Sequence, residues 1–200
     1  MPLAFSHRLA RHDDIPALKS LMASAIRDLQ RGFLTPDEIV ASASIMGLDT
    51  QLIDDETYFI IESDKRIAGS GGWSRRATLF GGDHSKGRNA ALLDPDNDAA
   101  RVRAMYTNPD FARRGIGRMI LAPCEEAAKA NRFSRVELAA TLAGEPLYRA
   151  CGYEPIEHFK SDTPQGLRIP LIRMEKRSEN YFSRLMQRAK RASSAIPRGK

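Results

Sequence analysis

Cysteine is scarce in this 200-residue chain, which contains only Cys124 and Cys151. The two residues have neither the spacing of a metal site nor the density of a disulfide framework. We therefore expect two small core residues in a reducing compartment, and no metal centre.

Long apolar runs are lacking as well, since no stretch reaches the roughly 18 residues that a membrane span needs. Residues 1–11 do not show the charged and then apolar plan of a secretory signal. A composition of 42% hydrophobic and 28% charged residues is typical of a soluble globular domain. We expect a single domain in a cytoplasmic protein.

Acidic residues are rare near the C-terminus. Residues 176–200 contain eight Lys or Arg and only Glu179, a net charge of +7, which leaves −1 for residues 1–175. The basic character therefore belongs to this tail. Its apolar residues at helical spacing predict a terminal helix that is solvated, or that contacts an anionic membrane, nucleic acid or a partner subunit in a homodimer. They are Tyr181, Phe182, Leu185, Met186 and Ala189.

The apolar patterns of the body predict both strands and helices. Strands are expected at residues 7–11, 57–62, 66–73, 101–106, 135–140, 153–159 and 168–175. Helices are expected from Pro16 to Leu29, from Pro36 to about Met46 behind a Thr35/Glu38 capping box, at 115–131 and at 145–151. Residues 75–99 have no sustained period and predict a long loop. Since helices and strands alternate only in part, we expect an α/β fold with a mixed sheet and helices on both faces.

The segment from Tyr106 to Ile120 predicts a strand that ends, turns through Pro109 and opens a helix on a glycine-rich loop. A helix N-terminus leaves backbone N–H groups unpaired and carries about half a positive charge. Gly115 and Gly117 allow a ligand to approach the backbone closely. The loop is therefore suited to a phosphate or pyrophosphate.

Three segments together resemble the GNAT superfamily of N-acetyltransferases. They are Arg101-Val-Arg-Ala-Met-Tyr-Thr-Asn-Pro109, Ala112-Arg-Arg-Gly-Ile-Gly117 and Leu147-Tyr-Arg-Ala-Cys-Gly-Tyr153. The resemblance covers nearly all of residues 1–175 and implies a mostly antiparallel sheet that splays at the cofactor-binding strand. It also implies transfer of an acetyl group from acetyl-CoA to a primary amine, by direct attack while both substrates are bound.

The resemblance further implies which residues hold acetyl-CoA. The backbone of the splayed strand would pair with the pantetheine arm, and the loop would bind the pyrophosphate. These positions are Met105, Tyr106, Thr107, Ala112, Arg113, Arg114, Gly115, Ile116, Gly117, Arg118 and Thr141. Ala112 stands where relatives usually have glutamine or arginine, and Thr141 where asparagine is common. Backbone contacts are therefore expected to dominate in this chain.

Tyr148 occupies the position from which a tyrosine in many relatives protonates the departing CoA thiolate. A phenol has a pKa of about 10, above that of a thiol at about 8.5, and is a reasonable donor. The structural alternative is a core aromatic residue on an amphipathic helix.

The base that deprotonates the amine is not indicated by the sequence. Glu62, Asp83, His84 and Glu137 are candidates, as is a chain of water molecules. His84 in the long loop has the most suitable intrinsic pKa, and its structural alternative is an exposed loop histidine.

The sequence does not identify the amine acceptor either, because a net charge of −1 on residues 1–175 attracts neither anions nor cations strongly. Small-molecule amines and peptide amines both remain candidates. The rival functions are a non-catalytic module that binds acyl-CoA and a domain tethered to nucleic acid by its tail.

Overall fold

Seven strands form a single sheet in the order β1-β2-β3-β4-β5-β7-β6. The computed structural model describes residues 4–178 together with Tyr181 and Met186. The strands are β1 (Ser6–Leu9), β2 (Tyr58–Ser63), β3 (Arg66–Ser74), β4 (Ala100–Thr107), β5 (Arg135–Thr141), β6 (Glu154–Asp162) and β7 (Arg168–Arg177). The helices are α1 (Ile15–Leu29), α2 (Pro36–Ser42), α3 (Gln51–Asp54), α4 (Ile116–Ala130) and α5 (Glu145–Ala150), with 3-10 turns η1 (His12–Asp14) and η2 (Pro109–Phe111). The predicted α/β class is confirmed.

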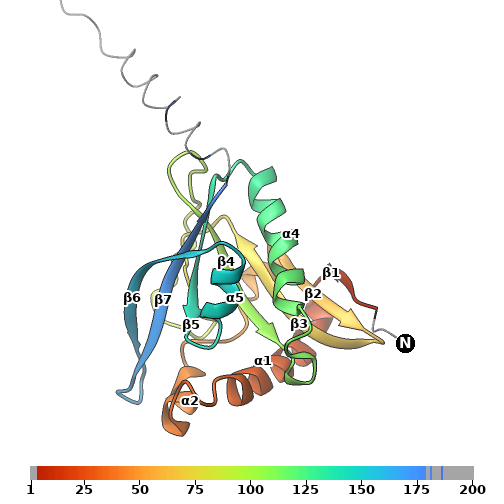
Figure 1. Ribbon diagram of the computed structural model, residues 1–200, viewed down its shortest axis with the longest axis vertical. Helices are drawn as coiled ribbons and strands as arrows, with labels where there is room; N and C mark the ends of the chain where they lie inside the picture. Colours follow the sequence, from red (N-terminus) through yellow and green to blue (C-terminus); the bar gives the residue numbers. More distant parts are fainter. Residues whose placement is uncertain (1–3, 179–180, 182–185, 187–200) are drawn as a thin grey trace, which may run out of the picture.

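The sheet opens between its two central strands. β4 and β5 are the parallel pair, and they meet only at Ala100 with Val136 and at Arg101 with Glu137. β5 continues against β7 from Arg135 to Thr141, whereas the rest of β4 stays with β3. The two halves of the sheet diverge toward the end at which α4 begins (Figure 1). The expected splay of a mostly antiparallel sheet is therefore confirmed.

Helix α4 covers one face of the sheet. Its residues Ile116, Ile120, Cys124 and Ala128 are buried, as their spacing of four predicts. The helix lies so close that a Cβ atom at Gly69 would come within 2.5 Å of the Ile116 side chain. The glycine-rich strand β3 is thus required by the close approach of α4.

Helix α1 covers the opposite face. Its apolar stripe of Leu18, Leu21, Met22, Ala25 and Ile26 is buried against Tyr58 and Ile60 of β2. Helices on both faces were expected, and both layers are visible in Figure 1. The preceding Asp14 does not cap α1 with its side chain, because its carboxylate binds Arg8 at 2.8 Å.

Helix α2 ends earlier than its sequence predicts. The Thr35/Glu38 capping box is present, but the helix stops at Ser42 and not at Met46. The hydroxyl groups of Ser42 and Ser44 donate to carbonyl groups three residues back, at Ile39 and Ala41. Such side-chain bonds compete with helix continuation, which explains the earlier end.

The chain between β3 and β4 has little regular structure. Residues 75–99 form an irregular segment crossed by one bridge between Arg76 and Leu92. β7 runs on through Lys176 and Arg177, so the first two residues of the basic tail belong to the sheet. Apart from Tyr181 and Met186, the predicted terminal helix lies outside the described residues. Within the described part of the chain, no helix is long and apolar enough to cross a membrane.

Candidate active site

A bulge in β4 redirects the strand where the sheet opens. The pairing with β3 jumps from Gly72 opposite Arg103 to Ser70 opposite Tyr106, which leaves two β4 residues facing one on β3. Ala104 lies in this bulge with a φ of 50°. Beyond it, the Met105 side chain packs in the core beneath α4 and Tyr106 in the core beneath α1.

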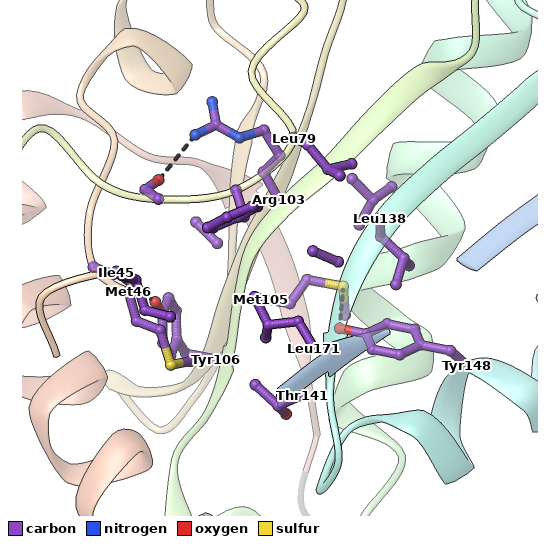
Figure 2. Close-up of a pocket in the computed structure, with 16 residues that line it drawn as sticks. Ile45, Met46, Leu79, Arg103, Met105, Tyr106, Leu138, Thr141, Tyr148 and Leu171 are labelled. Carbon is purple, nitrogen blue, oxygen red and sulfur yellow. Dashed lines mark hydrogen bonds between the residues drawn. The ribbon is translucent and has the colours of Figure 1, made fainter. Parts of the chain in front are cut away.

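A cavity of about 100 Å³ lies where β4 and β5 part. Its floor on the α4 side is formed by Met105, Leu138 and Tyr148 (Figure 2). The opposite side has five large apolar side chains, which we call the apolar wall: Ile45, Met46, Leu79, Phe80 and Leu171. The amide of Gly47 donates a 2.8 Å hydrogen bond to the Tyr106 hydroxyl and so fixes part of this wall against β4. The cavity joins the two faces of the sheet through the opening between its halves.

Tyr148 on α5 presents its hydroxyl to this cavity. The side chain is 9% exposed, and the hydroxyl points at the Met105 sulfur, 3.7 Å away (Figure 2). The ring meets Tyr153 edge to face, with centroids 6.0 Å apart. Burial raises the pKa of Tyr148 well above its ordinary value, so the phenol stays protonated at neutral pH.

The glycine-rich loop lies at the start of α4. Arg113 and Gly115 have positive φ angles of 64° and 82°. The amide of Ala112 already donates to Pro109, whereas the first hydrogen bond of the helix runs from Met119 to Gly115 at 3.1 Å. The amides of residues 116–118 therefore lie ahead of the first hydrogen bond of the helix, an arrangement that suits an anion.

The loop and the tyrosine helix are in contact. A Cβ atom at Gly117 would lie 2.3 Å from a methyl carbon of Leu147, the residue before Tyr148. Arg118 donates a 3.2 Å hydrogen bond to the carbonyl oxygen of Ala150 at the end of α5. The start of α4 and the helix that carries Tyr148 are thus held together, and Figure 1 shows α5 beside α4.

The remaining predicted cofactor residues differ in their freedom to bind. Arg113 and Arg114 are exposed, and the Arg114 guanidinium lies 5.9 Å from the centre of the Phe111 ring. The Thr141 hydroxyl accepts a 3.2 Å hydrogen bond from the amide of Gly144 and keeps its own hydrogen to donate. Thr107 pairs with Gly69 on the side of β4 away from the opening.

None of the four candidate bases lines the cavity. His84 is exposed, with Nε2 2.9 Å from the carbonyl oxygen of Ala43, to which it donates. Glu62 lies on β2 and pairs with Arg8 at 3.2 Å. The other two, Asp83 and Glu137, are engaged by arginine side chains.

A buried ion pair at the cavity was not predicted. Arg103 on β4 lines the cavity while only 5% exposed, and Asp49, which is fully buried, binds its guanidinium. The guanidinium also donates to the carbonyl oxygen of Gly81 at 2.9 Å (Figure 2). The partners lie 54 residues apart in the sequence, and no local pattern links them.

Comparison with solved structures shows the same fold. A GCN5-related N-acetyltransferase from Rhodopseudomonas palustris has 15% identity and a TM-score of 0.65, over 88% of this chain and 98% of that one. The ribosomal-protein-alanine N-acetyltransferase of Brucella melitensis has 17% identity and a TM-score of 0.58, over 86% and 99%. The PaiA N-acetyltransferase of Thermoplasma acidophilum, in complex with coenzyme A, has 14% identity and a TM-score of 0.55, over 87% and 99%.

A search of curated proteins found no match. The model of the acetyltransferase (GNAT) family matches residues 22–153, which include β4, the glycine-rich loop, α4 and Tyr148. The match spans more than half of the chain, and the chain therefore belongs to the GNAT acetyltransferase family and is an acyltransferase.

Proposed function

We propose that this protein transfers an acetyl group from acetyl-CoA to a primary amine by direct attack, with both substrates bound together. The observation that carries the proposal is the Tyr148 hydroxyl, which lies at the floor of the cavity with the Met105 sulfur as its hydrogen-bond partner. A thioether sulfur is a weak acceptor. A thiolate is a better acceptor and would readily take its place.

The chain offers features that fit both ends of acetyl-CoA. The free amides of residues 116–118 suit a pyrophosphate, because they point from a helix N-terminus. The edge of β4 that has left β5 can pair with the amides of the pantetheine arm, and Met105 in the bulge has no partner residue on β3. Thr141 can donate its hydroxyl hydrogen to the same arm. Arg113, Arg114 and Arg118 add positive charge around the pyrophosphate.

In the proposed reaction, the lone pair of the amine attacks the thioester carbonyl carbon, and the bond from that carbon to sulfur breaks. Tyr148 gives its proton to the sulfur, so CoA leaves as the thiol. The nitrogen releases one proton to solvent water, and the phenolate takes one back, so protons balance over the cycle. Holding amine and thioester together in the cavity supplies much of the rate.

The direct test is the variant Tyr148→Phe, which removes the hydroxyl and keeps the ring. Loss of general-acid catalysis should lower kcat by about 10²- to 10⁴-fold and leave the affinity for acetyl-CoA nearly unchanged. CoA-thiol release and calorimetric titration measure the two quantities. Tyr153→Phe is the matched control, since its ring is also buried and meets that of Tyr148, but Tyr153 does not line the cavity. An unchanged kcat in Tyr148→Phe would exclude the assigned role.

The alternative is a module that binds acyl-CoA without turnover. It predicts acetyl-CoA binding by the wild-type protein, with no CoA release above the level of Tyr148→Phe for any amine in a broad panel. Release that depends on the amine and on Tyr148 would contradict it.

A further inference from the structure

The apolar wall determines what kind of molecule can enter the cavity opposite Tyr148. Its side chains come from the α2–α3 connection, from the segment 75–99 and from β7. Phe80 is braced by Phe159 of β6, with ring centroids 5.7 Å apart. A surface of this kind favours an acceptor whose body is apolar. Polar groups would lose their hydrogen bonds to water there and find no hydrogen-bond partners on these side chains.

The charged side chain in the cavity lining is that of Arg103, and its positive charge is neutralised by a buried carboxylate. The carboxylate is that of Asp49, which is fully buried. Asp49 also binds Arg88, so its carboxylate is shared between two guanidinium groups. It is therefore not available as a counter-ion for a positively charged substrate.

Two further carboxylates that were candidate bases, Glu137 and Asp83, are engaged in the same way. Glu137 on β5 is 4% exposed and binds Arg101 and Arg173, the latter through Nε at 2.9 Å and Nη2 at 2.6 Å. Asp83 accepts hydrogen bonds from the Thr50 amide at 3.0 Å and from Arg88 at 3.2 Å. Carboxylate oxygens that already bind guanidinium groups are not free to bind an ammonium ion as well.

An ammonium ion entering this cavity would lose its water and find its potential counter-ions already paired. A neutral amine avoids this cost and already carries the lone pair that attacks. We infer that the acceptor is a weakly basic amine on an apolar body, of the arylamine class, which enters uncharged. The inference rests on the proposed acetyl transfer. An alkylamine as basic as lysine is uncharged in only about one molecule in 2,500 at pH 7, whereas an arylamine is mostly uncharged.

Aniline and cyclohexylamine test the inference, because both place an amine on a six-carbon ring and they differ strongly in basicity. CoA release by the wild-type protein gives kcat and KM for each between pH 6 and pH 9. The KM for aniline should not depend on pH, and the KM for total cyclohexylamine should fall about tenfold per pH unit as the free base accumulates. A KM for cyclohexylamine that is independent of pH and no higher than that for aniline would overturn the inference. Turnover with cyclohexylamine and none with aniline would overturn it as well.

A pair of variants at Leu79 tests whether the lack of a free counter-ion is what excludes ammonium ions from the cavity. Leu79 lines the cavity from the irregular segment and is half-buried, so a longer polar side chain can reach solvent. Leu79→Glu should lower the KM for cyclohexylamine at pH 7 by about tenfold relative to the uncharged control Leu79→Gln. Equal KM values in the two variants would show that the missing counter-ion is not what excludes ammonium ions.

The outcomes also separate this inference from the proposed function. Turnover of cyclohexylamine with a KM that is independent of pH and no higher than that for aniline overturns the arylamine class and leaves acetyl transfer intact. Binding of acetyl-CoA without CoA release for either amine, or for any other amine of the panel, overturns both.

Discussion

The hydroxyl of Tyr58 donates a 2.8 Å hydrogen bond to the carbonyl oxygen of Ala104, the residue at the bulge of β4. Tyr58 is fully buried on β2, and its hydroxyl also contacts the Ser70 hydroxyl at 3.0 Å. The bond crosses beneath β3 and fixes a left-handed backbone conformation that a residue with a Cβ adopts at a cost. Tyr58 is therefore a positioning residue for Met105, which follows the bulge and lines the cavity.

We predict that Tyr58→Phe lowers the free energy of unfolding by about 1–3 kcal/mol, because the buried Ser70 hydroxyl and the partly buried Ala104 carbonyl both lose a hydrogen-bond partner. It should also reduce kcat without abolishing acetyl-CoA binding. Tyr153→Phe is the control, and its stability should change little, since its hydroxyl has no hydrogen-bond partner in the described structure. Urea denaturation of the three proteins measures the difference. Equal destabilisation of the two variants would mean that the bulge does not depend on this bond.

Much of the fold could be predicted because its signals are local. The burial of α1 and α4 follows from apolar spacing, and the α2 start from the Thr35/Glu38 capping box. Strand ends differ from the prediction by up to three residues. As the predicted helix at 115–131 requires, α4 continues through Pro123 from Ile116 to Ala130, although proline has no N–H to donate to the turn before it.

The cavity could not be predicted, because its walls meet only in three dimensions. The four-residue α3 is too short to leave a periodic signal and was missed. The Arg103–Asp49 pair joins β4 to a connection with no pattern of its own. The bulge at Ala104 has no glycine or asparagine to mark it, and the bond that stabilises it comes from Tyr58, 46 residues earlier. Residue types alone marked His84 as a candidate base, but its position relative to the cavity required coordinates.

The pH dependence of kcat should reflect the burial of Tyr148. In the proposed reaction the phenol acts in its protonated form, so activity should be lost as pH rises through its pKa. Burial raises this pKa above the ordinary value of about 10. We predict that kcat with saturating aniline and acetyl-CoA shows no falling limb up to about pH 9.5. A limb near pH 8 that disappears in Tyr148→Phe would contradict the predicted shift.

Gly117→Ala should disturb the contact between the glycine-rich loop and α5. A Cβ atom there would lie 2.3 Å from a Leu147 methyl carbon, so either the helix start or α5 must move. We predict at least about tenfold weaker CoA binding by calorimetric titration, and partial recovery in the double variant with Leu147→Ala. Gly115→Ala is the comparison, because the space around it is open and its cost comes only from a φ of 82°. Additive losses in the double variant would exclude the steric explanation.

Asp49 should be the most sensitive carboxylate of the molecule. It is fully buried between Arg103 and Arg88, and Arg103 is itself almost fully buried. Asp49→Asn keeps the volume but leaves the Arg103 charge without its counter-ion, which should lower the free energy of unfolding by about 3–5 kcal/mol. Asp162→Asn removes an exposed partner of Arg168, 3.4 Å away, and should have no measurable effect. Urea denaturation compares the two variants. Equal stability of Asp49→Asn and Asp162→Asn would show that water reaches Arg103 in the cavity. An ammonium ion would then also keep water there, and the inferred exclusion of charged amines would lose its basis.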